Sequence, residues 1–289
     1  MSVVRSGAIR STAAERPDRA LVVAAHPDDI EFSAAGTVAR WAAAGSEIVY
    51  LLATDGDAGS NDPAIDPQML AATRRAEQQA AAARVGVRTV EFLGFADGML
   101  EPTLALRLAI TRAIRRHRPV AVICQDPSAY WLHSGYINHP DHLAAGAACM
   151  AAIYPSACTR LAFPELLDEV LEPHRVEEVY LTMTRAADHW IDIGTTLDAK
   201  LAAWRENRSQ IGVPGEVEAA IRRDAQQAAE ALHGTAYAEA FTYFRLGAAA
   251  AQVRVPGQTR AGRAGDRRRN GGRGDGRGIW GQHGRGHAG

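Results

Sequence analysis

The chain has 289 residues, of which 47% are hydrophobic and 22% are charged. That is enough to build the core of one large α/β domain or two small ones. Its 32 basic and 33 acidic residues nearly balance, which argues against a protein dedicated to nucleic acid or to a membrane surface.

Export and cysteine chemistry are not expected either. The sequence has no apolar run near the roughly 20 residues that cross a bilayer, and residues 1–20 lack the apolar core of a signal peptide. We therefore expect a cytoplasmic protein. Its three cysteines contain no C-x-x-C pair, so we predict neither a disulfide framework nor a thiolate zinc site.

Up to about Ala250, short apolar runs alternate with Ala-rich amphipathic stretches. This pattern predicts an α/β, Rossmann-like fold with a mostly parallel sheet flanked by helices. Strands are expected at 21–25, 47–53, 89–93, 120–125 and 178–183. Helices are expected at 32–44, 67–85, 103–116, 141–153, 197–208 and 216–232. Residues 237–246 form either a last edge strand or a short packed segment.

The last part of the sequence has a different composition. From Arg254 onward it carries nine Arg and two Asp, a net charge of +7, which leaves −8 on the rest of the chain. Because it has almost no aliphatic residues, we predict a disordered Gly/Arg-rich tail at 251–289. The predicted domain is 20–250, after an N-terminal extension at 1–19. Nucleic acid is not expected to bind the domain, while the tail is either an Arg-rich nucleic-acid-binding arm or an extension without a partner.

The first predicted strand leads into the sequence His26-Pro27-Asp28-Asp29. A dinucleotide site would need glycines at this position, and the carboxylates here would repel phosphate. Imidazole and carboxylate instead suit a divalent cation, with His26 and Asp29 as ligands and Asp28 free for proton transfer. In the alternative interpretation, an aspartate here only caps the following helix.

A second group of polar residues follows the fourth predicted strand, in the segment from His133 to His142. It supplies a third ligand candidate at the same edge of the sheet. Two histidines and one carboxylate leave coordination positions open for water and substrate, as in catalytic zinc sites. In the alternative, Asp141 caps a helix and the histidines beside it are solvated.

The sequence resembles the LmbE-like, or PIG-L-type, zinc-dependent N-deacetylases over roughly residues 21–246. The residues that carry the resemblance are His26-Pro27-Asp28-Asp29, Thr54-Asp55-Gly56-Asp57-Ala58-Gly59, Arg74-Arg75-Ala76-Glu77, Gly94-Phe95-Ala96-Asp97-Gly98 and His139-Pro140-Asp141-His142. The resemblance implies that one Zn²⁺ per chain is bound by His26, Asp29 and His142.

The resemblance also implies roles in the reaction. Asp28 would be the general base, and His139 would stabilise the oxyanion or protonate the leaving amine. Arg74 and Asp97 match positions that hold sugar hydroxyls. Some family members have a tyrosine two residues before the first histidine of the HPDH motif, where this chain has Ile137. The family's tyrosine role in oxyanion binding therefore does not carry over, and the nearest phenol, Tyr136, is assigned to substrate binding. His133 matches no motif, and we assign it to the pocket wall ahead of a ligand role.

The expected function is zinc-dependent hydrolysis of an N-acyl amide, an N-acetyl group on an N-acetylglucosaminyl-type small molecule. One alternative keeps the zinc site but acts as an amidase on a thiol conjugate or an antibiotic intermediate. Another is a Rossmann-like binding module without turnover. No membrane partner is expected, and the sequence leaves the oligomeric state open, a homo-oligomer included.

Overall fold

A computed structural model describes residues 9–10, 16–132, 135–212 and 214–247. All of them belong to one compact unit, residues 1–250. The predicted tail at 251–289 lies outside the described residues. The boundaries at 19/20 and 250/251 stay predictions. Within the described part of the chain, no helix has the length and apolar character needed to cross a membrane.

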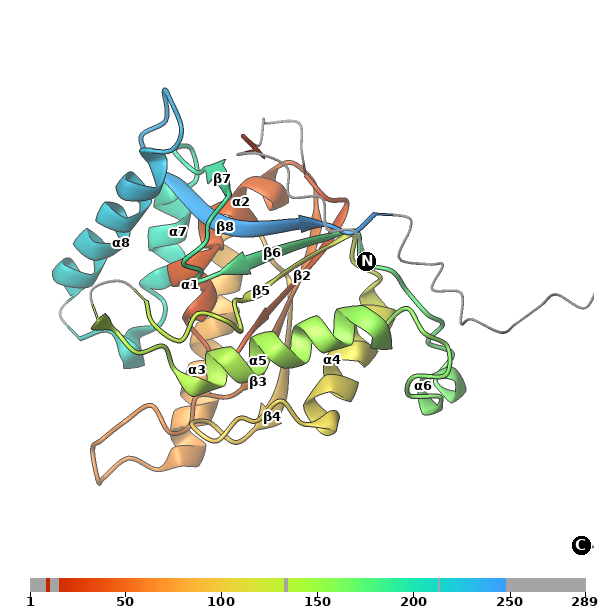
Figure 1. Cartoon of the computed structure of the whole chain (residues 1–289). Helices are drawn as coiled ribbons and strands as arrows, with labels where there is room; N and C mark the ends of the chain where they lie inside the picture. Colours follow the sequence, from red (N-terminus) through yellow and green to blue (C-terminus); the bar gives the residue numbers. More distant parts are fainter. Residues whose placement is uncertain (1–8, 11–15, 133–134, 213, 248–289) are drawn as a thin grey trace, which may run out of the picture. The chain divides into compact units, whose positions relative to one another are not determined.

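The sheet has eight strands in the order β1-β7-β8-β6-β5-β2-β3-β4 (Figure 1). The neighbours from β6 through β5, β2 and β3 to β4 are all parallel, whereas β8 is antiparallel to both β6 and β7. The strands are β1 (Ile9–Arg10), β2 (Arg19–Ala24), β3 (Glu47–Thr54), β4 (Thr89–Phe95), β5 (Ala121–Gln125), β6 (Glu178–Thr182), β7 (His189–Asp192) and β8 (Ala238–Arg245).

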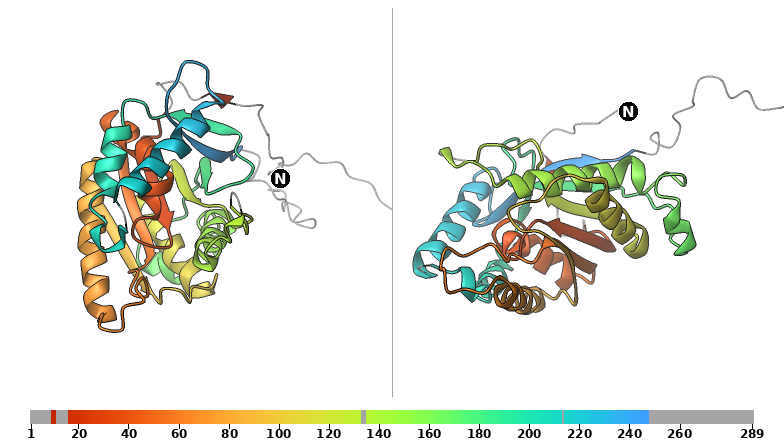
Figure 2. Two further views of the ribbon diagram at one scale, coloured as in Figure 1. Left: turned by 90° about the vertical axis from the view of Figure 1, so that its left-hand side faces the viewer. Right: turned by 90° about the horizontal axis from the view of Figure 1, so that it is seen from below.

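Helices cover both faces of the sheet (Figure 2). They are α1 (Asp29–Ser33), α2 (Ala35–Ala43), α3 (Pro67–Arg84), α4 (Leu104–His117), α5 (Pro140–Ala151), α6 (Glu165–Asp168), α7 (Leu197–Trp204) and α8 (Pro214–Ala229). A π-helical turn at Ala152–Ser156 and a 3-10 turn at Arg208–Gln210 complete the set.

The alternation of side chains along β2 and β3 decides which helices each face receives. Val22 and Tyr50 pack with residues of α2 and α3, while their neighbours Val23 and Leu51 pack with residues of α4 and α5. Successive side chains of a strand point to opposite faces, so a continuous apolar run is buried on both sides. The predicted mostly parallel, helix-flanked sheet is therefore confirmed.

The structure corrects several predicted elements. The helix expected at 32–44 begins earlier, at Asp29, and is divided at Ala34, where the backbone leaves helical geometry (φ −145°, ψ −3°). Residues 237–246 contain β8, which lies between β7 and β6 and is therefore not an edge strand. The sequence analysis missed β1, β7 and α6. Each is only two to four residues long, too short to show a hydrophobic period.

Candidate metal centre and active site

The candidate site lies where parallel strands end. His26 follows the end of β2, Asp55 follows β3, and Asp126 follows β5. Since these strands are parallel, their carboxyl ends meet at one edge of the sheet, where open α/β sheets bind ligands. The segment that follows β5 leads into α5, which begins at Pro140 and carries His142 in its first turn.

Three side chains predicted as metal ligands converge at this edge. One donor atom each of His26, Asp29 and His142 lies within 4.8 Å of the others, and all three residues are buried. His142 Nε2 is 3.0 Å from Asp29 Oδ1, and His26 Nδ1 is 3.4 Å from Asp29 Oδ2. The structure thus brings together a His-Asp-His donor set of the kind that binds zinc.

Neighbouring polar groups orient these donors. Asp29 Oδ2 accepts hydrogen bonds from the backbone N–H of His26 (2.8 Å) and from Gln125 Nε2 (2.9 Å). The Asn138 amide donates to Ala129 O (2.9 Å), so its Oδ1 is left to accept from His142 Nδ1 at 2.8 Å. This places a proton of His142 on Nδ1 and leaves Nε2, 3.0 Å from Asp29 Oδ1, as the nitrogen that a metal ion would use. The sequence analysis gave no role to Gln125 or Asn138.

Asp141 is a further residue of the site that the sequence analysis did not assign. It is fully buried and accepts hydrogen bonds from the backbone N–H groups of Gly98 (2.8 Å) and Leu100 (3.2 Å). Its Oδ2 lies 3.2 Å from His26 Nε2. The alternative in which Asp141 caps α5 is wrong, because the cap is His139, whose Nδ1 accepts the Asp141 N–H at 3.2 Å.

The carboxylates and histidines of the cluster shift one another's pKa values. Burial lowers the pKa of His26, but three surrounding carboxylates outweigh burial and raise that pKa to about 12. They are Asp29, Asp141 and Asp97. For Asp29, burial raises the pKa, but the two histidines outweigh it and hold the pKa well below its usual range. The buried carboxylates therefore hold a proton on His26, and a divalent cation among these donors would take over the role of that proton. The donor set fits a metal ion.

The pKa of Asp28 shifts in the direction opposite to that of Asp29. Burial and the Asp29 carboxylate raise the pKa of Asp28 to about 7, against a lowering effect of Arg74. Its side chain is 19% exposed, and its Oδ2 lies 3.4 Å from Arg74 Nη2. Asp28 stands at the N-cap position of α1 but makes no side-chain cap hydrogen bond, and Asp29 is the first residue of the helix, so the alternative in which one of these side chains only caps the helix is wrong. A carboxylate with a pKa near neutrality suits a general base.

His139 stands at the open side of the cluster, with its side chain 39% exposed. Its ring centroid is 4.7 Å from that of His26. Burial and the charge of His26 lower the pKa of His139. Because Nδ1 accepts a backbone N–H, the ring proton of neutral His139 is on Nε2. His139 thus offers one N–H donor toward the open side.

The residues matched to sugar binding are largely engaged within the protein. Arg74 donates to Pro27 O (2.7 Å) and Gly56 O (2.9 Å). Asp97 Oδ2 accepts from Ala58 N (2.9 Å), and its Oδ1 lies 3.1 Å from His26 Nε2. Gly56 adopts φ +71°, and a Cβ there would come within 2.3 Å of the Arg74 guanidinium. Arg74 and Asp97 therefore hold the loops of the site in place.

The segment between β5 and α5 contains two further residues predicted for the pocket, Tyr136 and His133. Tyr136 is 61% exposed, and its backbone oxygen accepts from Leu132 N at 2.8 Å. Its phenol makes no hydrogen bond with any residue in the described ranges. His133 lies outside the described residues.

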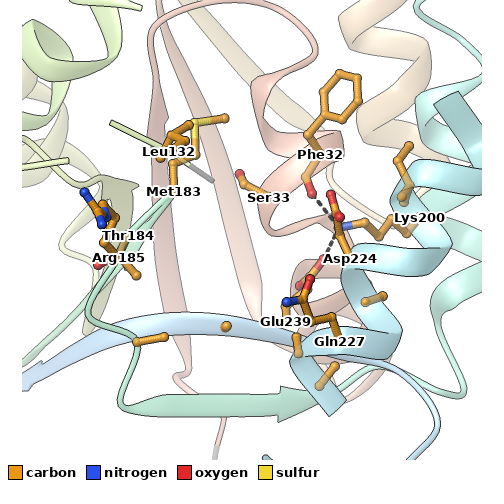
Figure 3. Close-up of a pocket in the computed structure, with 16 residues that line it drawn as sticks. Phe32, Ser33, Leu132, Met183, Thr184, Arg185, Lys200, Asp224, Gln227 and Glu239 are labelled. Atoms are coloured by element: carbon orange, nitrogen blue, oxygen red, sulfur yellow. Dashed lines mark hydrogen bonds and ion pairs between the residues drawn. The ribbon is translucent and has the colours of Figure 1, made fainter. Parts of the chain in front are cut away.

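A cavity of about 470 Å³ lies near the other end of α1 (Figure 3). Its lining includes Phe32 and Ser33 of α1, Arg185 before β7, and the buried pair Lys200 and Glu239. Lys200 Nζ donates to Glu239 Oε1 (2.5 Å) and to Phe32 O (2.9 Å). Glu239 also accepts from the backbone N–H groups of Gly36 (2.9 Å) and Thr37 (2.7 Å). These bonds fix the junction between α1 and α2.

Comparison with known proteins places the chain among deacetylases. The pattern of the family described as PIG-L, GlcNAc-PI de-N-acetylase, matches residues 21–153. The diacetylchitobiose deacetylase of Thermococcus kodakarensis is 32% identical over 192 residues, which cover 66% of this chain and 70% of that protein. The 1D-myo-inositol 2-acetamido-2-deoxy-alpha-D-glucopyranoside deacetylase of Rhodococcus erythropolis is 34% identical over 191 residues, which cover 57% of this chain and 61% of that protein.

A solved structure shows the same likeness in three dimensions. The N,N'-diacetylchitobiose deacetylase from Pyrococcus horikoshii, solved with an inhibitor, superposes with a TM-score of 0.73 at 29% sequence identity. The superposition covers 78% of this chain and 84% of the other.

Proposed function

The chain belongs to the PIG-L family of de-N-acetylases and is an amide hydrolase, and from this premise we propose that it removes the acetyl group from a small N-acetylglucosaminyl compound. The observation that carries the proposal is the juxtaposition of two kinds of group. A buried His26-Asp29-His142 donor set stands beside Asp28, a carboxylate whose pKa is raised to about 7.

We assign one Zn²⁺ per chain to His26, Asp29 and His142. The fit rests on the excess of buried carboxylate and on the orientation of His142 by Asn138. A zinc ion held there would lower the pKa of water and polarise a carbonyl oxygen. Three protein ligands leave room for both water and substrate, as a catalytic site requires.

Asp28 and His139 carry out proton transfer and stabilise the oxyanion. Asp28 takes a proton from the attacking water and afterwards delivers it to the departing amine, because a pKa near 7 allows both transfers at neutral pH. His139 donates a hydrogen bond through Nε2–H to the oxygen of the attacked carbonyl. Of the two roles that the resemblance implies for His139, its lowered pKa favours this donor role over that of the acid.

The sugar moiety is assigned to Arg74, Asp97 and Tyr136. Arg74 uses Nη1 and Nη2 on carbonyl oxygens, but each of these nitrogens carries two N–H groups, which leaves donors for a sugar hydroxyl. Tyr136 is an exposed ring that can pack against a sugar face. Two relatives are named for N-acetylated amino-sugar substrates, which supports this substrate class over a thiol conjugate or an antibiotic intermediate.

The test combines metal analysis with a screen. The purified protein should contain about one zinc per chain and should release acetate from N-acetylglucosamine, from N,N'-diacetylchitobiose or from N-acetylglucosaminyl-inositol. Asp28→Asn should retain the zinc and lose most of the activity, on the order of 10²-fold or more. A variant with zinc and the parental rate would remove Asp28 as the base. A protein without metal and without acetate release would be a binding module instead.

A further inference from the structure

The backbone of Asp28 is held in a conformation that L-residues rarely adopt. Its φ is +89° and its ψ is −26°, and such positive φ values at non-glycine residues persist only where surrounding structure restrains them. The direction of the Asp28 carboxylate depends on this backbone geometry. Whatever restrains the backbone of Asp28 therefore also aims the proposed base.

Gln78, on α3, supplies one such restraint. Its Oε1 accepts the backbone N–H of Asp28 at 2.7 Å, a contact that joins residues 50 positions apart. The Gln78 side chain is fully buried, so its amide oxygen is kept from solvent. The bond ties the loop after β2 to the middle of α3.

Glu31 determines which way the Gln78 amide faces. A backbone N–H can only donate, so Gln78 must present its oxygen to Asp28 and needs an acceptor for its NH₂ group. Glu31 Oε1 is that acceptor, at 3.1 Å from Gln78 Nε2. If the amide turned over, it would face Asp28 with a donor. Glu31 therefore locks the amide in the orientation that holds Asp28.

A residue that only filled space would not need a hydrogen-bond acceptor at this position. Glu31 is fully buried on α1, and its Oε2 has no hydrogen-bond partner among the described residues. A buried polar atom without a partner destabilises the folded state, and an apolar side chain of similar size would avoid that loss. The contact with Gln78 explains why an acceptor oxygen stands here.

We propose that Glu31 and Gln78 form a positioning pair that holds the backbone of Asp28 and thereby aims its carboxylate. Neither residue touches the substrate. The pair rests on the proposed function only in that Asp28 is the base; the restraint on the Asp28 N–H stands without it.

The kinetic test compares two substitutions of Glu31 in the zinc-loaded full chain. Glu31→Leu removes the acceptor, and kcat for acetate release should fall about 10- to 100-fold while KM and zinc content stay unchanged. Glu31→Gln keeps an acceptor oxygen for Gln78 Nε2, so kcat should stay within about threefold of the parent. Equal loss in both variants, or loss in neither, would overturn the proposal.

A double variant tests whether the two residues act as one unit. Gln78→Met should lower kcat as Glu31→Leu does, and Glu31→Leu/Gln78→Met should be no slower than either single variant. Losses that multiply would show two independent effects and contradict the pair. Gln78→Met also serves if Glu31→Leu does not fold.

A readout without substrate separates this proposal from the proposed function. The Asp28 amide proton, followed by NMR, should exchange slowly in the parent and in Glu31→Gln, and at least about tenfold faster in Glu31→Leu. If the parent hydrolyses none of the N-acetyl compounds but this pattern holds, the proposed function fails and the positioning pair stands. If Asp28 exchanges alike in all three proteins, the pair fails.

Discussion

Two buried clusters of charged side chains lie near opposite ends of α1, and they are built on different principles. Near the last turn of the helix, Lys200 meets Glu239, and both groups are almost completely buried. At the start of the helix, Asp29 lies among His26, His142 and further carboxylates. The same five-residue helix thus separates an ion pair from a candidate metal site.

The two clusters differ in how their charge is balanced. Lys200 and Glu239 carry opposite charges, and backbone groups of Phe32, Gly36 and Thr37 complete their hydrogen bonds. At the other end, the carboxylates raise the pKa of His26 to about 12. A cluster that is balanced within the chain needs no further charge, whereas excess buried negative charge favours the binding of a cation. This difference separates the Lys200–Glu239 ion pair from the proposed metal site.

The largest expected effect comes from removing charge at the site. Asp29→Asn takes away the carboxylate that faces both histidines, so zinc content should fall from about one per chain to near zero. Acetate release should fall about 10³-fold or more, because the activation of water depends on the metal. Metal analysis after dialysis and an acetate assay measure both.

Asp126→Asn is the matched control for that change. Asp126 is a buried aspartate at the same edge of the sheet, but its Oδ1 binds only Ser128 N (2.8 Å) and Ser128 Oγ (2.6 Å) in the described structure. Its zinc content should equal that of the parent. If Asp29→Asn kept its zinc, the difference drawn between the two clusters would not hold.

Substitutions in the Lys200–Glu239 ion pair should change the free energy of unfolding but not the zinc content. Lys200→Met leaves the Glu239 carboxylate buried without its cation, which should lower the free energy of unfolding by about 3–5 kcal/mol, measured by urea denaturation. The variant Lys200→Met/Glu239→Gln should recover part of that loss, because the amide carries no charge and its oxygen can still accept from one of the two N–H groups of Gly36 and Thr37. Zinc content should not change.

An exposed ion pair provides the comparison. Arg160 and Glu172 meet at 2.6 Å, but each side chain is 59% exposed, so Arg160→Met should change the free energy of unfolding by only about 0–1 kcal/mol. If Lys200→Met cost no more than Arg160→Met, burial of the Lys200–Glu239 pair would have no energetic consequence.

A smaller effect on zinc binding is expected from changing Asn138, which contacts the proposed ligand His142. Asn138→Leu removes the acceptor for His142 Nδ1, so the ring proton is no longer fixed and zinc affinity should fall about 10- to 100-fold. Asn138→Asp keeps an acceptor oxygen for His142 Nδ1 but loses the donor to Ala129 O, so its zinc affinity should lie between those of the parent and Asn138→Leu. Competition with a chelating dye measures both affinities.

Asn207→Leu controls for the loss of a buried asparagine as such. Asn207 is as buried as Asn138 but lies after α7, and its zinc affinity should match that of the parent. Weaker binding in both leucine variants would indicate general loosening of the fold rather than loss of ligand orientation.

The sequence predicted the fold where structure is local or repeats with a period. β3 is an apolar run buried on both faces, and α3 begins at Pro67 as expected. The place of β8 depends on pairing with β6 and β7, which no local pattern specifies. The division at Ala34 lies within an Ala-rich stretch, where propensity favours continuous helix. Tertiary contacts there outweigh local preference.

The site was predictable to the extent that it is contiguous in sequence. His26 and Asp29 are three residues apart, and the sequence alone suggested that they converge. The HPDH motif supplied His142. Gln125 reaches Asp29 across 96 residues, and Gln78 reaches Glu31 across 47. Such contacts follow from the register between strands and helices, so amide side chains that hold the ligands carry no signal of their own in one sequence.

The smallest expected effect concerns a buried histidine that stands apart from both clusters. His189, at the start of β7, is buried with its ring stacked on Tyr243 (centroids 4.8 Å apart). Neither ring nitrogen has a hydrogen-bond partner among the described residues. Burial lowers the pKa of His189, against a weaker raising effect of Asp188. The same side chain that is held protonated at position 26 is thus held neutral at position 189.

The folded-state pKa of His189 is below its unfolded value, so the unfolded chain binds more protons as pH falls below about 6.5. This contribution to stability is complete above that pH and is lost as pH falls through the folded pKa. His189→Phe places another aromatic ring at this position, and that ring cannot bind a proton. Its advantage over the parent in urea denaturation, measured with chelator present, should therefore grow from pH 7.5 to pH 5. Other histidines titrate in both proteins and cancel in the difference, so a difference that stayed constant with pH would show that folding does not lower the pKa of His189.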